Sequence, residues 1–245
     1  MKIDVRIVMV VASFALAITS LPSSIRADEK ADPSGVWSIK IAFPGRPANE
    51  STLRLEQASD KIIGVMTDFR GRSTPIKDAE LKDGQLSFHL TFKAQDREFS
   101  FLYKGKITSD SFKGTVKADF GGRKLNFPFD GKRKKEESGT ATANLAGTWK
   151  LKVPFKSDEI FEPTLKLTQK GSVVSGTYVG QGETRIGEAL VLGNEFTFEV
   201  AQDRDGKKYR LRYQGKVNGD TIKGSVDYDF DGIIGILDFD GHRIK

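Results

Sequence analysis

Cysteine is absent from this chain of 245 residues, and histidine occurs only twice. Without thiols there can be no disulfides, iron–sulfur clusters, thiolate zinc sites, thiol catalysis or lipid-modified N-terminal cysteine. His89 and His242 stand in unrelated segments, so the sequence offers neither a hydrolase triad nor a histidine-rich zinc site. We therefore expect no enzyme and no cofactor, and we interpret both histidines as surface residues.

Long apolar runs are also missing, except close to the N-terminus. Lys2 and Arg6 precede an apolar stretch from Ile7 to Leu21, and Ala27 ends the short segment that follows. This order is typical of a secretory signal peptide. The apolar stretch is shorter than the roughly 20 residues that a membrane-spanning helix needs. The sequence thus predicts export to the periplasm or beyond, with no transmembrane span in the mature protein.

An internal repeat occupies the rest of the chain. The segment from Gly35 to Arg133 recurs from Gly147 to Arg243, with shared Gly-x-Trp, Thr-Leu-x-Leu-x-Gln, Tyr-x-Gly-Lys and Phe-Asp-Gly-x-Arg motifs. Each copy has the size of a normal domain, which exceeds the repeat length of solenoids. We therefore divide the chain into a signal peptide over 1–27, a tail over 28–34, a first domain over 35–134, a linker over 135–146 and a second domain over 147–245.

Within each copy the apolar residues recur at every second position. Leu86, Phe88, Leu90 and Phe92 alternate with polar residues, and pairs such as Asp83-Gly84 separate such runs at short intervals. This pattern predicts strands with one buried face, joined by tight hairpins. About eight strands per copy would close most economically into a barrel without exposed edges. The predicted fold class is all-β, with two tandem eight-stranded antiparallel up-and-down β-barrels.

The two ends of each copy resemble those of calycin barrels, the grouping that includes lipocalins, fatty-acid-binding proteins and avidins. The resemblance rests on Trp37 and Trp149 in the Gly-x-Trp motifs and on Arg133 and Arg243 after the last strands. The chain is also similar to small barrel repeats of uncharacterised secreted bacterial proteins. The calycin resemblance implies that Arg133 covers Trp37 and that Arg243 covers Trp149, a cation on an aromatic face where each barrel closes.

An acidic motif near the C-terminus has the spacing of a calcium loop. Asp227, Asp229 and Asp231 alternate, Gly232 follows, and Asp238 stands where an EF-hand has its bidentate ligand. An EF-hand also needs flanking helices, whereas the surrounding residues have the pattern of strands. We interpret these acids as the solvent-exposed face of a strand with an Asp-Gly turn, and a looser calcium site is the alternative.

A second candidate is the Ala-Gln-Asp-Arg segment that occurs in both copies. It contains Asp96 and Arg97 in the first copy and Asp203 and Arg204 in the second. Such a pair at a barrel rim could bind a carboxylate or a charge on a partner. The interpretation that we prefer is a hairpin with a local salt bridge.

Charge differs between the copies. Lys and Arg clearly exceed Asp and Glu in the first copy, whereas the second copy is close to neutral. An excess of positive charge favours contact with an anionic surface, such as envelope lipid, polysaccharide or an acidic protein partner. We do not expect nucleic acid as a partner, because export separates the protein from it and the aromatic residues have inward parity.

Large rings dominate the inward positions of the first copy. An eight-stranded barrel is only wide enough to be filled by side chains or to hold one small ligand. The sequence therefore favours an exported, non-enzymatic interaction module that acts through its outer surface or rim. A carrier of a small apolar ligand is the alternative, and an enzyme ranks third. The inward rings are Trp37, Phe43, Phe88, Phe92, Phe99, Phe101, Tyr103, Phe112, Phe120, Phe127 and Phe129.

Overall fold

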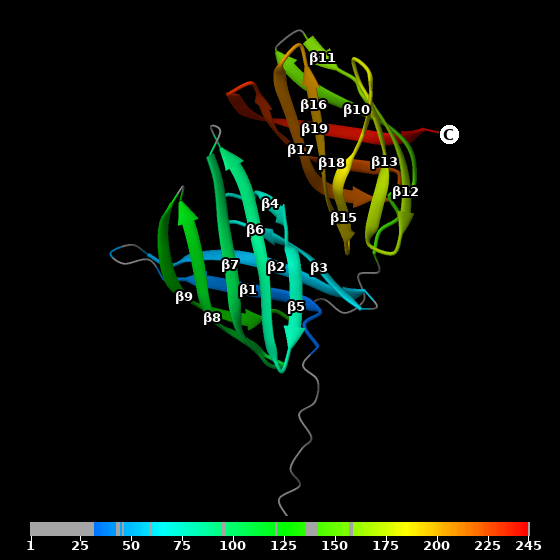
Figure 1. Cartoon of the computed structure of the whole chain (residues 1–245). Coiled ribbons are helices and arrows are strands. Elements are labelled where there is room, and N and C mark those ends of the chain that lie inside the picture. The colour runs from blue at the N-terminus through cyan, green and yellow to red at the C-terminus, as the bar shows by residue number, and fades with distance from the viewer. Residues whose placement is uncertain are drawn as a thin grey trace, which may run out of the picture.

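Two β-barrels follow one another along the chain (Figure 1). The computed structural model describes residues 32–42, 45, 47–58, 60–94, 97–120, 122–135, 142–156 and 159–244. Within these residues every regular element is a strand, which confirms the all-β fold class. The predicted signal peptide over 1–27 lies outside them.

Barrel 1 comprises β1 (Gly35–Ile41), β2 (Asn49–Ala58), β3 (Lys61–Thr67), β4 (Ser73–Pro75), β5 (Lys77–Lys82), β6 (Gln85–Ala94), β7 (Arg97–Ile107), β8 (Ser111–Phe120) and β9 (Arg123–Arg133). Barrel 2 comprises β10 (Gly147–Lys156), β11 (Glu159–Phe161), β12 (Thr164–Lys170), β13 (Val173–Val179), β14 (Glu183–Arg185), β15 (Gly187–Leu192), β16 (Glu195–Arg204), β17 (Lys207–Asn218), β18 (Thr221–Phe230) and β19 (Ile233–Ile244).

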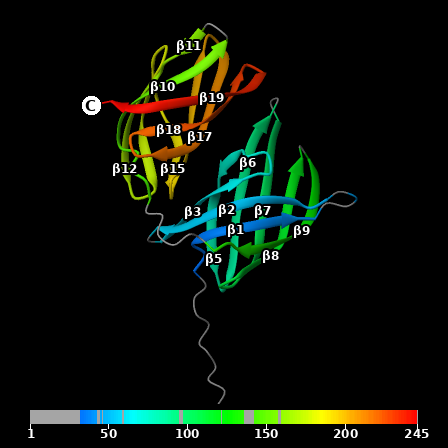
Figure 2. The ribbon, with the colours of Figure 1, turned by 180° about the vertical axis from the view of Figure 1, so that it is seen from behind.

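Both barrels are up-and-down meanders in which the first long strand pairs with the last. In barrel 1, β1 pairs antiparallel with β9, and in barrel 2, β10 pairs with β19; Figure 2 shows both seams. Barrel 2 is closed around its circumference by the β13–β15 pairing. Barrel 1 is nearly closed: its sheet runs from β4 and β3 around to β5, and Ile76, which immediately precedes β5, donates its N–H to Gly64 O on β3 at 2.9 Å.

The Asp-Gly turns have the geometry that the sequence predicts. Asp83-Gly84, Asp205-Gly206 and Asp231-Gly232 have positive φ at both residues. They connect β5 to β6, β16 to β17 and β18 to β19. A two-residue turn with two positive φ angles matches the right-handed twist of the strands that it joins.

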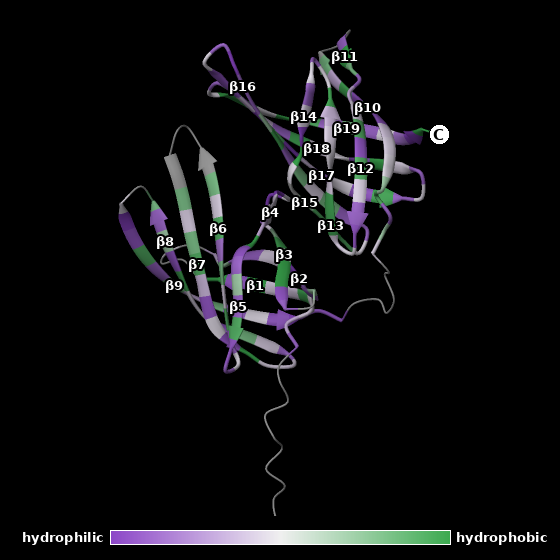
Figure 3. Ribbon diagram, turned by 45° about the vertical axis from the view of Figure 1, so that its right-hand side comes forward, coloured by the Kyte–Doolittle hydropathy of each residue, from purple (hydrophilic) through white to green (hydrophobic). Residues whose placement is uncertain are grey.

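Each barrel has its own hydrophobic core. Figure 3 shows hydrophobic and hydrophilic residues alternating along the strands. The buried residues form two separate clusters, one around Trp37, Phe88 and Phe112 and the other around Trp149 and Tyr213. The clusters do not merge, so each copy buries its apolar face by itself.

Glycines face each other where two strands come closest. Gly105 pairs with Gly114 in barrel 1, and Gly215 pairs with Gly224 in barrel 2. A Cβ at any of these positions would overlap the backbone of the neighbouring strand. The repeated glycines thus permit the close approach of β7 to β8 and of β17 to β18.

Residues just outside the predicted domain bounds contact the barrels. Pro33 is buried, and its carbonyl accepts a hydrogen bond from Trp37 Nε1 at 2.9 Å. Leu145 belongs to the core of barrel 2, and its carbonyl accepts one from Trp149 Nε1 at 2.9 Å. Residues 32–34 and 142–146 are therefore parts of the barrels. The physical reason is that each buried indole N–H needs an acceptor, which a backbone carbonyl four residues before the tryptophan supplies.

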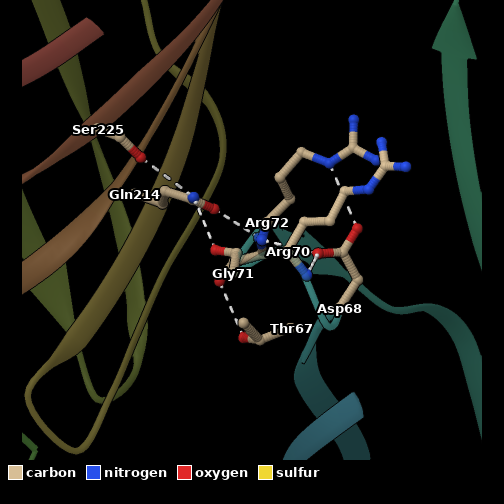
Figure 4. Close-up of polar contacts among 8 residues, drawn as sticks. Thr67, Asp68, Arg70, Gly71, Arg72, Gln214 and Ser225 are labelled. Atoms are coloured by element: carbon tan, nitrogen blue, oxygen red, sulfur yellow. Dashed lines mark hydrogen bonds and ion pairs between the residues drawn. The ribbon is translucent and has the colours of Figure 1, made fainter. Parts of the chain in front are cut away.

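The barrels contact each other through a loop of barrel 1 and the outer face of barrel 2. Gln214 Oε1 on β17 accepts a hydrogen bond from Ser73 N at 2.5 Å. Gln214 Nε2 donates to Gly71 O at 2.9 Å and to Ser225 Oγ on β18 at 3.2 Å (Figure 4). The Asp68 carboxylate orders this loop, because its Oδ1 accepts from the backbone N–H groups of residues 70 and 72.

Further contacts join the hairpins of barrel 2 to β2. Ser172 Oγ donates to Glu56 Oε2 at 2.5 Å, and Arg54 Nε lies 3.8 Å from Glu195 Oε2. Ser172 and Glu195 belong to the end of barrel 2 that contains Trp149. In Figure 1, the β10–β11 hairpin at the opposite end points away from barrel 1.

Candidate functional site

Each barrel has a closed end at its tryptophan and a mouth at the opposite end. In barrel 1 the Arg133 Cζ lies 4.2 Å from the centre of the Trp37 ring, the position that the calycin resemblance implies. The same guanidinium donates hydrogen bonds to the carbonyls of Ser34 and Ser109, and to that of Asp32 at 2.7 Å. Trp37 has no exposed surface. This end is sealed and leaves no space for a ligand.

Barrel 2 repeats this closure. Arg243 Cζ lies 4.2 Å from the centre of the Trp149 ring, and Trp149 has no exposed surface. The guanidinium donates to the carbonyls of Ala146 and Asn144 and, through Nε, to Asp220 Oδ1 at 2.8 Å. These four predicted closure residues therefore have a structural role, and binding sites must be sought elsewhere.

The mouth of barrel 1 is filled by aromatic rings. Phe92 stacks on Phe99 at 5.1 Å and on Phe101 at 5.6 Å. Phe120 meets the edges of Phe99 and Phe101 at 6.0 and 5.6 Å. Four rings in contact occupy the space that a ligand would need, as expected from the inward parity of these residues. Phe43, which was expected to join them, lies outside the described residues.

The mouth of barrel 2 is open. It holds a pocket of about 280 Å³ with an aromatic and aliphatic wall and a few polar groups. Small-molecule sites are typically concave and apolar in this way, with few polar groups that orient the ligand. The pocket is lined by Val153, Phe155, Glu159, Phe161, Tyr178, Gln181, Gln202, Arg204, Tyr209, Leu211, Tyr213, Val226, Tyr228, Phe230 and Leu237.

The strand registers explain why one mouth is filled and the other is open. Phe88 pairs with Tyr103 in barrel 1, and Phe198 pairs with Tyr213 in barrel 2. Counting along β6 and β16 from these pairs, Gln202 takes the place of Phe92. Counting along β7 and β17, Leu211 takes the place of Phe101. The two replacements remove two of the stacked rings. The aromatic filling that the sequence indicates for the first copy therefore does not extend to barrel 2.

A second exchange reshapes the wall of the pocket. In barrel 1, Ala118 on β8 pairs with Leu125 on β9. In barrel 2 the corresponding residues are Tyr228 and Gly235, which pair in the same register. A Cβ on Gly235 would overlap the Tyr228 ring. The larger residue of the pair is therefore on β9 in barrel 1 and on β18 in barrel 2. In barrel 2, Tyr228 stacks on Phe230 at 4.9 Å and contacts Phe155 at 6.3 Å.

Two tyrosine hydroxyls form the floor of the pocket. The Tyr178 and Tyr213 oxygens lie 3.3 Å apart, and both side chains are buried. Burial raises the pKa of Tyr178 to about 12, although its hydrogen bond with Tyr213 lowers that pKa in part. Burial, together with the charge of Tyr178 and the hydrogen bond between the two, raises the pKa of Tyr213 well above its usual value. Both groups are therefore protonated, neutral hydroxyls at physiological pH.

Polar side chains stand at the rim of this mouth. Arg204 donates to Gln181 Oε1 at 3.0 Å and to the Gln181 carbonyl at 3.3 Å, and Gln202 Nε2 donates to Thr184 Oγ1. The expected local salt bridge with Asp203 is wrong, because the Arg204 side chain crosses the mouth to Gln181. In the first copy, Asp96 lies outside the described residues, and only the backbone of Arg97 is described.

The acidic motif lies on two strands rather than in a loop. Asp227 and Asp229 belong to β18, Asp231 to the turn and Asp238 to β19; Asp229 Oδ1 accepts from Gly232 N at 2.8 Å. Among the described residues no group of three or more acidic or histidine side chains could hold a metal ion. His89 on β6 has Nδ1 3.9 Å from Asp78 Oδ2, and His242 is exposed on β19.

Asp227 faces the loop of barrel 1. Its Oδ1 is buried and has no hydrogen-bond partner within the described part of the chain. Burial raises the pKa of Asp227, and the nearby Asp68 raises it further, whereas Arg72 and Arg212 lower it. The carboxylate thus belongs to the contact between the barrels.

A lysine face covers the outside of β7, β8 and β9 in barrel 1. It consists of six exposed lysines: Lys104, Lys106, Lys113, Lys117, Lys124 and Lys132. Lys106 pairs directly with Lys113 across the strands, and Asp130 Oδ2 lies 3.1 Å from Lys113 Nζ. The positive charge that the sequence assigns to the first copy is therefore concentrated, in part, on one face of one sheet.

A second hollow, of about 340 Å³, lies beside this face. It is lined by Glu80, Lys82, Asp83, Gln85, Ser87 and Lys104, which carry charges of both signs. The lining is mainly polar and charged, so the hollow lacks the apolar wall that is typical of a small-molecule site. None of the described residues forms a helix that is long and apolar enough to span a membrane.

Comparisons with known proteins add little to this geometry. No family model and no curated protein matches the chain. A Bacteroides fragilis protein provisionally named an outer membrane protein has a TM-score of 0.32 and 10% identity, over 86% of this chain and 97% of its own. A Nitrosomonas europaea protein provisionally named AttH has a TM-score of 0.21 and 9% identity, over 94% and 99%. At such scores no property of either protein is transferred to this chain.

Proposed function

We propose that this protein is an exported, non-enzymatic binding protein whose second barrel holds one small, largely apolar ligand in its mouth. One observation carries the proposal: Gln202 and Leu211 leave a pocket of about 280 Å³ where Phe92 and Phe101 fill barrel 1. The order of preference derived from the sequence is thereby reversed, with the carrier above the interaction module. Export rests on the signal-peptide pattern of residues 1–27.

The barrel ends support a relationship to calycins. An arginine over the first-strand tryptophan closes both copies, as the resemblance implies. Ligand binding inside a barrel mouth is compatible with an eight-stranded barrel, which has room for one small ligand when large side chains are absent.

The test introduces into barrel 2 the two phenylalanines that fill the mouth of barrel 1. We expect the neutral fluorescent probe N-phenyl-1-naphthylamine to bind the mature protein with enhanced emission. The double variant Gln202→Phe/Leu211→Phe should lose this binding, because two rings then fill the pocket. The reciprocal variant Phe92→Gln/Phe101→Leu is the control and should leave the site in barrel 2 intact. Binding that is unchanged in Gln202→Phe/Leu211→Phe would exclude the pocket as the site.

A second function follows from the lysine face. We propose that it attaches the protein to an anionic lipid surface, because six exposed lysines lie on three adjacent strands. Binding to vesicles of anionic phospholipid should weaken with added salt, since the screening length falls from about 10 Å at 0.1 M to about 3 Å at 1 M. Replacing Lys106 and Lys113 with Gln should weaken it too, whereas replacing Lys166 and Lys170 of barrel 2 should not. Equal binding to neutral vesicles would contradict this proposal.

A further inference from the structure

We propose that the pocket of barrel 2 selects apolar ligands that carry one uncharged hydrogen-bond acceptor, such as a ketone or ester carbonyl, which binds the hydroxyls of Tyr178 and Tyr213. This inference rests on the proposed ligand-binding function and adds the chemical class of the ligand.

The two tyrosine hydroxyls at the floor of the pocket have one more hydrogen-bond donor than they use between them. Two phenolic hydroxyls supply two O–H donors, and their 3.3 Å contact uses one of them. Within the described part of the chain the structure shows no other hydrogen-bond partner for either hydroxyl. One O–H at the floor is therefore left to donate. A buried donor without an acceptor is unfavourable, so a ligand that brings an acceptor gains more than a purely apolar one.

The acceptor should be uncharged because the floor offers no positive charge. Both hydroxyls keep their protons, and they are dipoles rather than ions. Arg204 is the cation among the residues that line the pocket, and it lies exposed at the rim with its guanidinium on Gln181. A carboxylate at the floor would lose its hydration without a counter-ion, which is costly.

The body of the ligand should be flat and apolar. Tyr228 and Phe230 stack at 4.9 Å with an angle of 30° between their planes, and Phe155 lies at an angle to Tyr228 at 6.3 Å. Leu211, Val226 and Leu237 complete the wall. Such a wall gains most from an aromatic ligand, through apolar burial and ring contacts.

The hydroxyl pair is specific to barrel 2. Leu165 pairs with Tyr178, and the corresponding Leu53 of barrel 1 pairs with Met66. Barrel 1 keeps one tyrosine, Tyr103, at the place of Tyr213, where it stacks on Phe88 at 4.9 Å. The second hydroxyl is thus found in the barrel whose mouth is open, as a role in ligand binding requires.

Three naphthalenes of similar size test the inference by calorimetry on the mature protein. We expect 2-acetylnaphthalene to bind about 3- to 10-fold more tightly than 2-ethylnaphthalene, the range for one hydrogen bond. We expect 2-naphthoate to bind more weakly than either. Tyr178→Phe and Tyr213→Phe each retain one donor and should keep the preference. The double variant retains no donor and should lose it, with the binding of 2-ethylnaphthalene undiminished.

The outcomes separate this inference from the proposed function. If neither neutral naphthalene binds, the proposed function fails. If both bind equally, or 2-naphthoate binds best, the pocket is a binding site but the inferred chemistry is wrong. Tyr103→Phe is the matched control, because it removes a hydroxyl from the filled barrel, and it should change nothing. If the double variant does not fold, the comparison of the three compounds on the unaltered protein still decides.

Discussion

At the closed end of barrel 2, Arg243 contacts several groups at once: the Trp149 ring, two backbone carbonyls and Asp220. We expect Arg243→Ala to lower the free energy of unfolding by about 2 kcal/mol, since it removes a cation–π contact and charge-assisted hydrogen bonds. Urea unfolding followed by tryptophan fluorescence measures this loss. Arg123→Ala, at an exposed position at the start of β9 in barrel 1, is the control and should cost less than about 0.5 kcal/mol. Equal effects of the two variants would contradict a stabilising role for the closure.

Asp227 makes stability depend on pH in the direction opposite to that of most paired carboxylates. Its folded-state pKa is raised, chiefly by burial, so the folded protein binds more protons than the unfolded chain just above the ordinary carboxyl range. Stability should therefore fall as the pH rises through the folded pKa. We expect Asp227→Asn to be more stable than the unaltered protein at pH 7. The difference in stability between the two proteins should disappear below about pH 4, where Asp227 is protonated in the folded protein and increasingly protonated in the unfolded chain.

Urea unfolding at a series of pH values tests this expectation. Asp240→Asn, at an exposed position on β19, is the control for the removal of one carboxylate from barrel 2. If Asp227→Asn is less stable at pH 7, attraction to Arg72 and Arg212 outweighs the cost of burial.

At the scale of elements, the wall of the pocket depends on which of two paired strands carries the large side chain. Gly235→Leu alone should destabilise barrel 2 by about 1 to 3 kcal/mol, because the new side chain overlaps the Tyr228 ring. The double variant Tyr228→Ala/Gly235→Leu reproduces Ala118 and Leu125 of barrel 1 and should recover most of that loss. Thermal unfolding of the single and double variants gives the coupling energy. Additive effects would show that the exchange is not compensatory.

At the scale of the whole molecule, Gln214 fixes how the barrels meet. Its amide accepts from Ser73 N and donates to Gly71 O. We expect Gln214→Ala to accelerate hydrogen exchange at the Ser73 amide severalfold, because that donor loses its acceptor. Exchange within the cores of both barrels should stay unchanged. Asn126→Ala, at an exposed position of barrel 1, provides the control. Unchanged protection of Ser73 would mean that other contacts hold the loop.

The sequence predicts the shared architecture of the two barrels better than it predicts the difference between their mouths. Alternation of apolar residues and the Asp-Gly turns are local patterns, and they predict the strands and the barrels. The arginine over the tryptophan at the closed end of each barrel follows instead from the calycin resemblance. The filled mouth of barrel 1 followed from the parity of its rings. The open mouth of barrel 2 has a weaker signal in the sequence, namely Gln202 and Leu211 at the positions of Phe92 and Phe101, and recognising it requires the strand register.

Two up-and-down barrels with separate cores follow from the sequence alone, because strand periodicity and turn geometry act over a few residues. Three further features depend on the folded chain: the carbonyls that accept from the two tryptophans, the contact of Gln214 with the loop of barrel 1, and the pairing of the Tyr178 and Tyr213 hydroxyls. The physical reason is distance along the chain. These contacts join positions whose approach depends on barrel closure and strand register, which no local pattern specifies.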